Sequence, residues 1–288
     1  LSRGEVLRYD VVDKRSILGT SDETTQSVQS KTDSRKVWKV TDVFPEGDIE
    51  FINLVERVHM INRLPDNKGT EYDSERDKVP PPGFEDTARS IGAPLSSLRM
   101  TDRGKTVSRK PLLRGKNVDE DAPIALRLPD EPVAIGDTWD EPFEVKVSLP
   151  QGASKLVKTR WHHKLADVKD GVATIEVTYQ VLTPIDAQVE LQVVQRLMSG
   201  KVQFDIERGR ILSRQMGVDK RILDFAGPTS SVEYVMKMEE KLVENHPETA
   251  ATKTRTNTAA AVDAHHPTTK TRTANRAHSQ QSSKTYRR

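Results

Sequence analysis

The stretch DRGKTVSR at residues 102–109 decides the fold, because it recurs as ERGRILSR at residues 207–214. Four of the eight positions are identical, and the other four keep charge sign or aliphatic or β-branched character. An Arg-Gly pair by itself is typical of a tight turn between strands, since glycine readily adopts the left-handed backbone of such turns. Its recurrence indicates that one β-rich unit is written twice in the chain.

The flanks of the two stretches recur in the same order. Gly4-Glu5 opens the first copy and Gly136-Asp137 opens the second, while Trp38 and Trp161 each precede a glycine-containing turn. The tryptophan and the Arg-Gly pair lie farther apart in the first copy than in the second. We expect its extra residues in the proline-rich segment at residues 80–98.

Apolar and polar residues alternate along most of residues 1–245, as at residues 173–181 and 232–238. This period of two predicts antiparallel strands with one buried face. One helix is predicted after Asp186, which can cap it, because Val189, Val193 and Leu197 recur every four residues. A shorter helix is predicted near residues 84–92, and both helices come just before the strand that leads to an Arg-Gly turn.

The sequence therefore predicts a mainly β (α+β) fold. We expect two tandem repeats, each an antiparallel curved sheet or half-barrel with one helix, at residues 1–130 and 131–245, and we expect them to pack as one unit. Residues 246–288 contain no Leu, Ile, Met, Phe or Trp, which predicts a disordered low-complexity tail.

Charge is distributed unevenly. The tail carries +6 of a chain whose net charge is +2, which leaves −4 for residues 1–245. The folded part thus offers no overall basic field, and nucleic acid is not an expected partner. TKTRT occurs twice in the tail, at residues 252–256 and 269–273. It can be interpreted as a contact for an anionic polymer or as a solvated extension.

Several kinds of chemistry find no support. The chain has no cysteine, which excludes disulfides and thiolate chemistry, and it has no phosphate-binding glycine motif and no nucleophile elbow. No apolar run is long enough to span a bilayer. We therefore expect a protein that is not an enzyme, with no catalytic residue, no cofactor and no metal site.

Individual polar and aromatic residues have two interpretations each. His59, His162 and His163 are expected as surface histidines, with His162 and His163 on opposite faces of a strand, whereas His265-His266 in the tail can bind metal weakly. Arginines 103, 109, 208 and 214 would form an anion site if the copies face each other; otherwise they serve as turn and edge-strand residues. Tryptophans 38, 139 and 161 are expected as core anchors rather than sugar platforms.

Four segments also carry a family resemblance. GEVLRY at residues 4–9, PPPGFED at 80–86, VAIGDTW at 133–139 and VLTPID at 181–186 resemble elements of an uncharacterised, domain-of-unknown-function family of secreted bacterial β-rich proteins. The resemblance covers about residues 4–244. It implies a secreted, periplasmic or cell-envelope protein exported with a signal peptide or lipoprotein leader, which this chain, starting at Leu1, does not display. The family has no established activity, so no site residue is carried over.

Three functions follow as hypotheses. The first is a non-catalytic envelope module that binds a hydrophobic ligand or a lipoprotein between two curved sheets. The second is an interaction scaffold that contacts an anionic surface through its basic tail, and the third is a carboxylate-dependent hydrolase. An open apolar cavity favours the first, and a fully packed core favours the second.

Overall fold

The computed structural model describes residues 1–21, 24–65, 69–113, 125–149 and 152–243. Residues 1–245 form one compact unit. The predicted tail, including His265-His266, lies outside the described residues.

The elements of the first half alternate strands with one short helix. They are β1 (Val6–Ser21), β2 (Thr24–Val43), β3 (Ile49–Arg63), β4 (Gly69–Asp73), α1 (Glu85–Ser90), β5 (Ser96–Met100) and β6 (Thr106–Pro111).

The second half has a similar order of elements. They are β7 (Thr138–Ser148), β8 (Ser154–Lys169), β9 (Val172–Val181), α2 (Ala187–Val193) with a following 3-10 turn (Val194–Arg196), β10 (Ser199–Asp205), β11 (Arg210–Leu223) and β12 (Ser231–Leu242).

Within the described residues, these strands form one antiparallel sheet of twelve strands, not two sheets. Its order is β6-β5-β3-β2-β1-β12-β11-β10-β9-β8-β7, with β4 paired to β3. The first strand of the chain pairs with the last, in a register that runs from Tyr9↔Leu242 to Thr20↔Ser231. The mainly β prediction is confirmed. The two curved sheets expected to pack as one unit are one continuous sheet, because the β1–β12 ladder joins the halves. The duplication and the boundary at residue 130 stay predictions.

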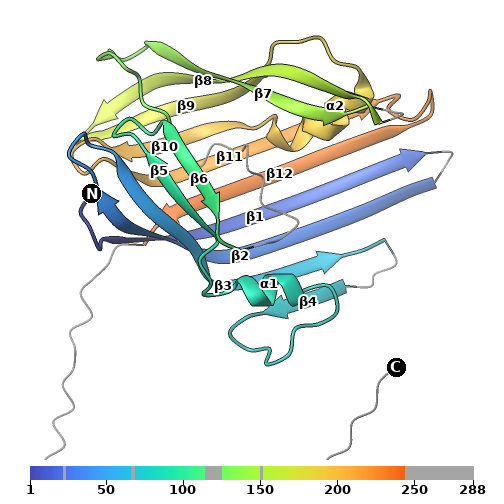
Figure 1. Cartoon of the computed structure of the whole chain (residues 1–288). Helices are drawn as coiled ribbons and strands as arrows, with labels where there is room; N and C mark the ends of the chain where they lie inside the picture. Colours follow the sequence, from blue (N-terminus) through green and yellow to red (C-terminus); the bar gives the residue numbers. More distant parts are fainter. Residues whose placement is uncertain (22–23, 66–68, 114–124, 150–151, 244–288) are drawn as a thin grey trace, which may run out of the picture. The chain divides into compact units, whose positions relative to one another are not determined.

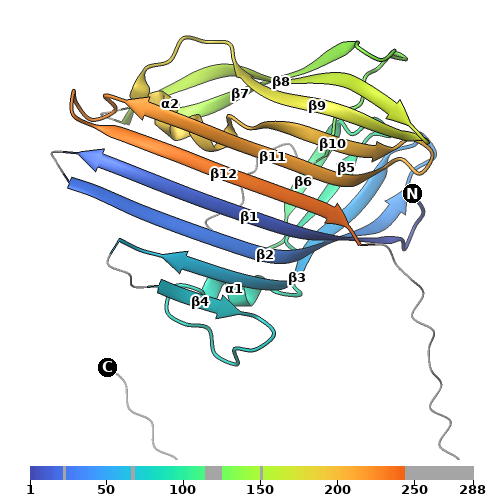
Figure 2. The same ribbon diagram turned by 180° about the vertical axis from the view of Figure 1, so that it is seen from behind.

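The sheet is curved, and one face lies inside the curve (Figures 1 and 2). Alternation decides which side chains lie there. In β9, Ala173, Ile175, Val177 and Tyr179 are buried, whereas the residues between them are more exposed. Because cross-strand partners share a face, the register carries this apolar layer from strand to strand.

Helix α2 covers part of the inner face. Asp186 caps it as predicted, since its carboxylate accepts a hydrogen bond from the Val189 backbone N–H at 2.9 Å. Val189 and Val193 are buried against β7 and β8 residues in one apolar cluster. The helix contacts both β7 and β11, which are separated by β8, β9 and β10, so it lies across the curve (Figure 1).

Helix α1 lies within the predicted residues 84–92 and precedes β5, as α2 precedes β10. Phe84, just before it, packs on Tyr72 of β4 with ring centroids 5.5 Å apart. The connection from β3 to α1, residues 64–84, contains β4, whereas residues 182–186 alone connect β9 to α2. The extra length of the first half therefore lies mainly at residues 64–84, not at residues 80–98.

Candidate functional site

The two Arg-Gly stretches lie on one pocket. Asp102 and Gly104 of the first turn and Gly209 and Arg210 of the second turn line the same cavity of about 110 Å³. The first turn connects β5 to β6, and the second connects β10 to β11. The recurrence that stood out in the sequence therefore marks two turns that meet in space.

Each turn is closed by local hydrogen bonds. In the first, the Gly104 N–H donates to the Thr101 carbonyl at 3.0 Å. In the second, the Gly209 N–H donates to the Asp205 carbonyl at 2.9 Å, and the Asp205 carboxylate accepts from the Arg208 N–H at 2.9 Å. Both glycines have positive φ, +79° and +61°, which explains why glycine recurs at this point.

The segment at residues 125–129 crosses from the first turn to the second half of the sheet. The Leu128 N–H donates to the Arg103 carbonyl at 2.9 Å, and the Trp139 indole N–H donates to the Arg127 carbonyl at 2.8 Å. Leu126, directly before Arg127, is buried in the cluster that contains Trp161. The segment thus forms one wall of the pocket.

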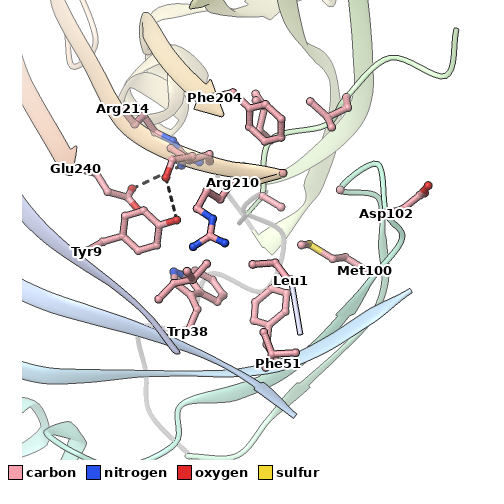
Figure 3. A pocket seen from close by; sticks show the side chains of 18 residues that line it. Leu1, Tyr9, Trp38, Phe51, Met100, Asp102, Phe204, Arg210, Arg214 and Glu240 are labelled. Carbon is pink, nitrogen blue, oxygen red and sulfur yellow. Dashed lines mark hydrogen bonds and ion pairs between the residues drawn. The ribbon is translucent and has the colours of Figure 1, made fainter. Parts of the chain in front are cut away.

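The pocket walls are mainly apolar. Aromatic rings from two strands meet there, since Trp38 and Phe51 pack edge to face with ring centroids 4.7 Å apart. Figure 3 shows both rings facing the cavity, with Phe204 across from them. Further apolar walls come from Leu7, Val40, Met100, Leu126, Leu128 and Ile211.

Tyr9 lies at the polar end of the pocket. Its hydroxyl donates to the Ile211 carbonyl at 3.1 Å, a contact that reaches from β1 across β12 to β11. Burial raises the pKa of Tyr9, and the charge of Glu240 raises it further. The phenol therefore stays protonated and remains a hydrogen-bond donor at neutral pH.

Two arginines accompany Tyr9 (Figure 3). Arg210 pairs with Glu5 at 2.9 Å, and Arg214 lies 4.0 Å from Glu240. Burial raises the pKa of Glu5, but the Ser2 N–H and the charge of Arg210 outweigh it, so the pKa lies below its usual value. Positive and negative charges thus nearly balance at this end.

The arginines keep unused donors. The Nε atoms of Arg210 and Arg214 are buried and have no hydrogen-bond partner among the described residues. A buried donor without an acceptor is costly. Both Nε atoms are closed off from solvent, so an occupant of the pocket meets the apolar walls rather than these donors.

Of the two interpretations of the four arginines, the anion site does not form. Arg103 donates to the Pro129 carbonyl, Arg208 pairs with Asp205 at 3.4 Å, and Arg109 lies in the edge strand β6. Of the four, Arg214 alone lines the pocket, together with Arg210, which sequence reasoning missed. The signal was present, because Arg210 directly follows the second Arg-Gly pair.

The tryptophans divide into two roles. Trp161 is buried in the largest apolar cluster, as expected of a core anchor, and Trp139 packs against the same cluster. Trp38 instead is half-buried and lines the pocket. Alternation alone does not separate these roles, since all three side chains point to the inner face.

The three described histidines differ in burial, whereas the sequence predicts that all three lie at the surface. His59 lies 2.7 Å from Glu71, and His162 lies 2.7 Å from Asp140, both partly exposed. His163 is only 2% exposed, so its assignment to the surface is wrong. His162 and His163 do lie on opposite faces. The described residues contain no group of three or more His, Asp or Glu placed to hold a metal.

The pocket carboxylates do not converge. Figure 3 places Glu240 beside Tyr9 and Arg214, and Asp102 on the opposite side of the cavity. Glycosidases commonly use two carboxyl groups that flank the same bond, and the two pocket carboxylates do not have this arrangement. The described pocket has mainly apolar walls and one polar end.

Comparisons with known proteins add likenesses of low identity. No family model matches the chain, and none of the curated proteins matches it. The chain is similar to a solved structure described as "Lipid-protein interactions in lipovitellin", with a TM-score of 0.44 and 11% identity over 84% of this chain and 25% of that chain. This chain thus spans about a quarter of the length of that one.

A second solved structure is a DUF1329 family protein from Desulfovibrio piger. It is 8% identical, with a TM-score of 0.16, over 83% of this chain and 86% of that chain. Among the described residues there is no helix of the length and apolarity needed to cross a membrane.

Proposed function

We propose that this protein is a non-catalytic binding module that accepts an apolar group between its two Arg-Gly turns. The observation that carries the proposal is the pocket itself, which combines apolar walls around Trp38 with the polar end at Tyr9, Arg210 and Arg214. Small-molecule sites commonly have this arrangement of apolar lining with a few convergent polar groups.

The size of the cavity limits the occupant. About 110 Å³ is below the roughly 300–1,000 Å³ of typical ligand sites. Elsewhere in the second half, α2 and Leu126 pack in apolar clusters with residues of the sheet. The pocket therefore suits the end of one acyl chain, with the remainder outside, rather than a whole lipid held between two sheets.

The polar end selects weakly for charge. Because Arg210 pairs with Glu5 and Arg214 lies 4.0 Å from Glu240, the electrostatic field at the polar end of the pocket is small. An alcohol and a carboxylate with the same chain should therefore bind with affinities within about tenfold of each other, with most of the free energy coming from buried CH₂ groups at about 0.8 kcal/mol each.

Terminally brominated decanol and decanoate test the proposal, because bromine quenches a tryptophan that it touches. We expect saturable quenching of the full chain's fluorescence, and its loss in Trp38→Phe, since Trp38 lines the pocket and Trp139 and Trp161 do not.

A variant that fills the pocket provides a second test. Ala125→Phe places a ring in the pocket and should weaken binding at least about tenfold, whereas Leu156→Phe adds the same ring at a site that is 57% exposed and should change nothing. Equal binding by both variants, or quenching that persists in Trp38→Phe, would refute binding in this pocket.

A bacterial envelope or secreted location and an envelope lipoprotein as a partner fit a module that takes up an acyl chain end. The scaffold alternative depends on the tail, which lies outside the described residues. It predicts salt-sensitive binding to an anionic surface that is lost when residues 246–288 are deleted.

A further inference from the structure

Three lysines from distant parts of the sequence stand side by side on the outer face of the sheet. Lys14 of β1 pairs in register with Lys237 of β12 on one side and with Lys31 of β2 on the other. We call these three residues the lysine row. All three are exposed, and each alternates with inner-face residues, so their side chains point away from the pocket.

The row has an unfavourable arrangement for stability. Side chains directly opposite each other in a ladder have Cβ atoms about 4.5–5.5 Å apart, and like charges at such positions are destabilising. Lys31 pairs with Asp33 at 2.8 Å. Lys14 and Lys237 make no ion pair with any described residue. Neither of these two adjacent ammonium groups is thus held in an ion pair within the described part of the chain.

A shallow hollow surrounds the row. It has a volume of about 390 Å³, and its lining includes the three lysines, Arg63, Ile61 and Val235. No aspartate or glutamate of the described residues lines it. Arg15 also borders it, but its charge is matched by Asp13 at 2.8 Å. Across from Lys237, Gly217 presents no side chain that would cover the ammonium group.

We propose that the lysine row docks the protein on the anionic phospholipid head groups of a membrane surface. Charge complementarity selects phosphate-bearing partners. The position in the sheet selects a surface over a free phosphate ion. Tight small-anion sites use converging backbone N–H groups, but here the ladders on both sides of β1 occupy the backbone donors.

The geometry fits an extended surface. Neighbouring strands are about 4.8 Å apart, so the row spans about 10 Å. Half-buried Ile61 and Val235 add apolar area beside it. Lysines near an anionic surface contribute about 1 kcal/mol each, which corresponds to about fivefold in partitioning. The inference is independent of the pocket on the inner face.

The test compares two full-length triple variants with the same change in net charge. The row variant is Lys14→Gln, Lys31→Gln and Lys237→Gln. The control is Lys146→Gln, Lys158→Gln and Lys164→Gln, which removes exposed lysines of β7 and β8. In the control, Lys158 and Lys164 stand opposite Glu144 and Glu176. Both variants keep residues 246–288, so any contribution of the tail is common to them.

Co-sedimentation with phosphatidylcholine vesicles, with and without phosphatidylglycerol, measures the effect. We expect the row variant to lose at least about tenfold in partitioning to the anionic vesicles, and the control to lose less than about twofold. Equal partitioning of the two variants would overturn the proposal. So would displacement of the parent protein by millimolar inorganic phosphate beyond that caused by sodium chloride of equal ionic strength, because the hollow would then be a small-anion site.

Thermal unfolding shows whether a loss of binding reflects a loss of structure. Because the row places like charges opposite each other, the row variant should unfold at the same temperature as the parent or at a higher one. Its Trp38 quenching by brominated decanol should also be unchanged. That readout keeps failure of the lysine row distinct from failure of the pocket.

Discussion

His163 illustrates at the residue scale how burial changes the chemistry of a side chain. Its ring stacks on Trp139, with centroids 5.2 Å apart and planes 6° from parallel. Burial lowers the pKa of His163 to about 4, and its hydrogen bond with the Trp139 backbone offsets only part of this effect. The imidazole is therefore neutral at physiological pH and belongs to the core.

The burial of neutral His163 predicts that the folded protein loses stability in acid. Its pKa falls from 6.5 in the unfolded chain to about 4 in the folded one, so the unfolded state binds more protons between these values. The contribution of neutral His163 to the free energy of unfolding is fully present above about pH 6.5. It falls by about 2–3 kcal/mol as the pH is lowered toward about 4. Urea unfolding at about pH 7.5 and at about pH 4.5 should show this extra loss in the parent and not in His163→Phe.

A matched variant separates this effect from general acid destabilisation. His162→Phe, on the outer face, should keep the acid sensitivity of the parent. An equal pH dependence of the parent and His163→Phe would contradict the assignment.

At the scale of elements, the two Arg-Gly turns have the same motif but different surroundings. A Cβ atom added to Gly104 would lie 2.2 Å from the Leu126 carbonyl oxygen, whereas one added to Gly209 would meet nothing within 4 Å. The first turn supports the segment at residues 125–129, and the second is open.

Alanine at the two positions should therefore have unequal effects. Gly209→Ala carries only the cost of a left-handed backbone, about 1 kcal/mol, whereas Gly104→Ala must also displace Leu126 and should cost about 3 kcal/mol or more. Urea denaturation of both variants measures the difference. Equal costs would mean that the contact between the first turn and this segment does not contribute to stability.

At the scale of the whole molecule, the β1–β12 ladder makes the two halves one sheet. Residues from both halves also line the pocket, which includes Trp38 of β2 and Arg214 of β11. Neither half could unfold without exposing a long sheet edge of the other. Residues 1–245 should therefore unfold as one cooperative unit.

Calorimetry tests this expectation, with equal van't Hoff and calorimetric enthalpies as the sign of one transition. Val193→Ala, at a site that is 0% exposed in α2, should cost about 2 kcal/mol and shift the whole transition downward without splitting it. Val168→Ala, at a site that is 38% exposed, should cost less than about 0.5 kcal/mol. Two separate transitions would instead show that residues 1–130 and 131–245 fold independently.

The sequence by itself determined the elements of this protein. Period-two alternation predicts the antiparallel strands, a four-residue apolar period with Asp186 predicts α2, and the recurring Arg-Gly pairs predict two turns. Each of these signals is local, because strand and helix periods and glycine conformations are decided within a few residues.

Only the tertiary structure decided which of these elements meet. The pairing of β1 with β12, the meeting of the two turns around Trp38, and the alignment of Lys14, Lys31 and Lys237 all join residues far apart in the chain. Composition assigns a slight negative charge to the folded part, yet the sheet register gathers three of its positive charges into one row. Register is set by ladder hydrogen bonds and shared burial across strands, and a single sequence read along its length carries no measure of either.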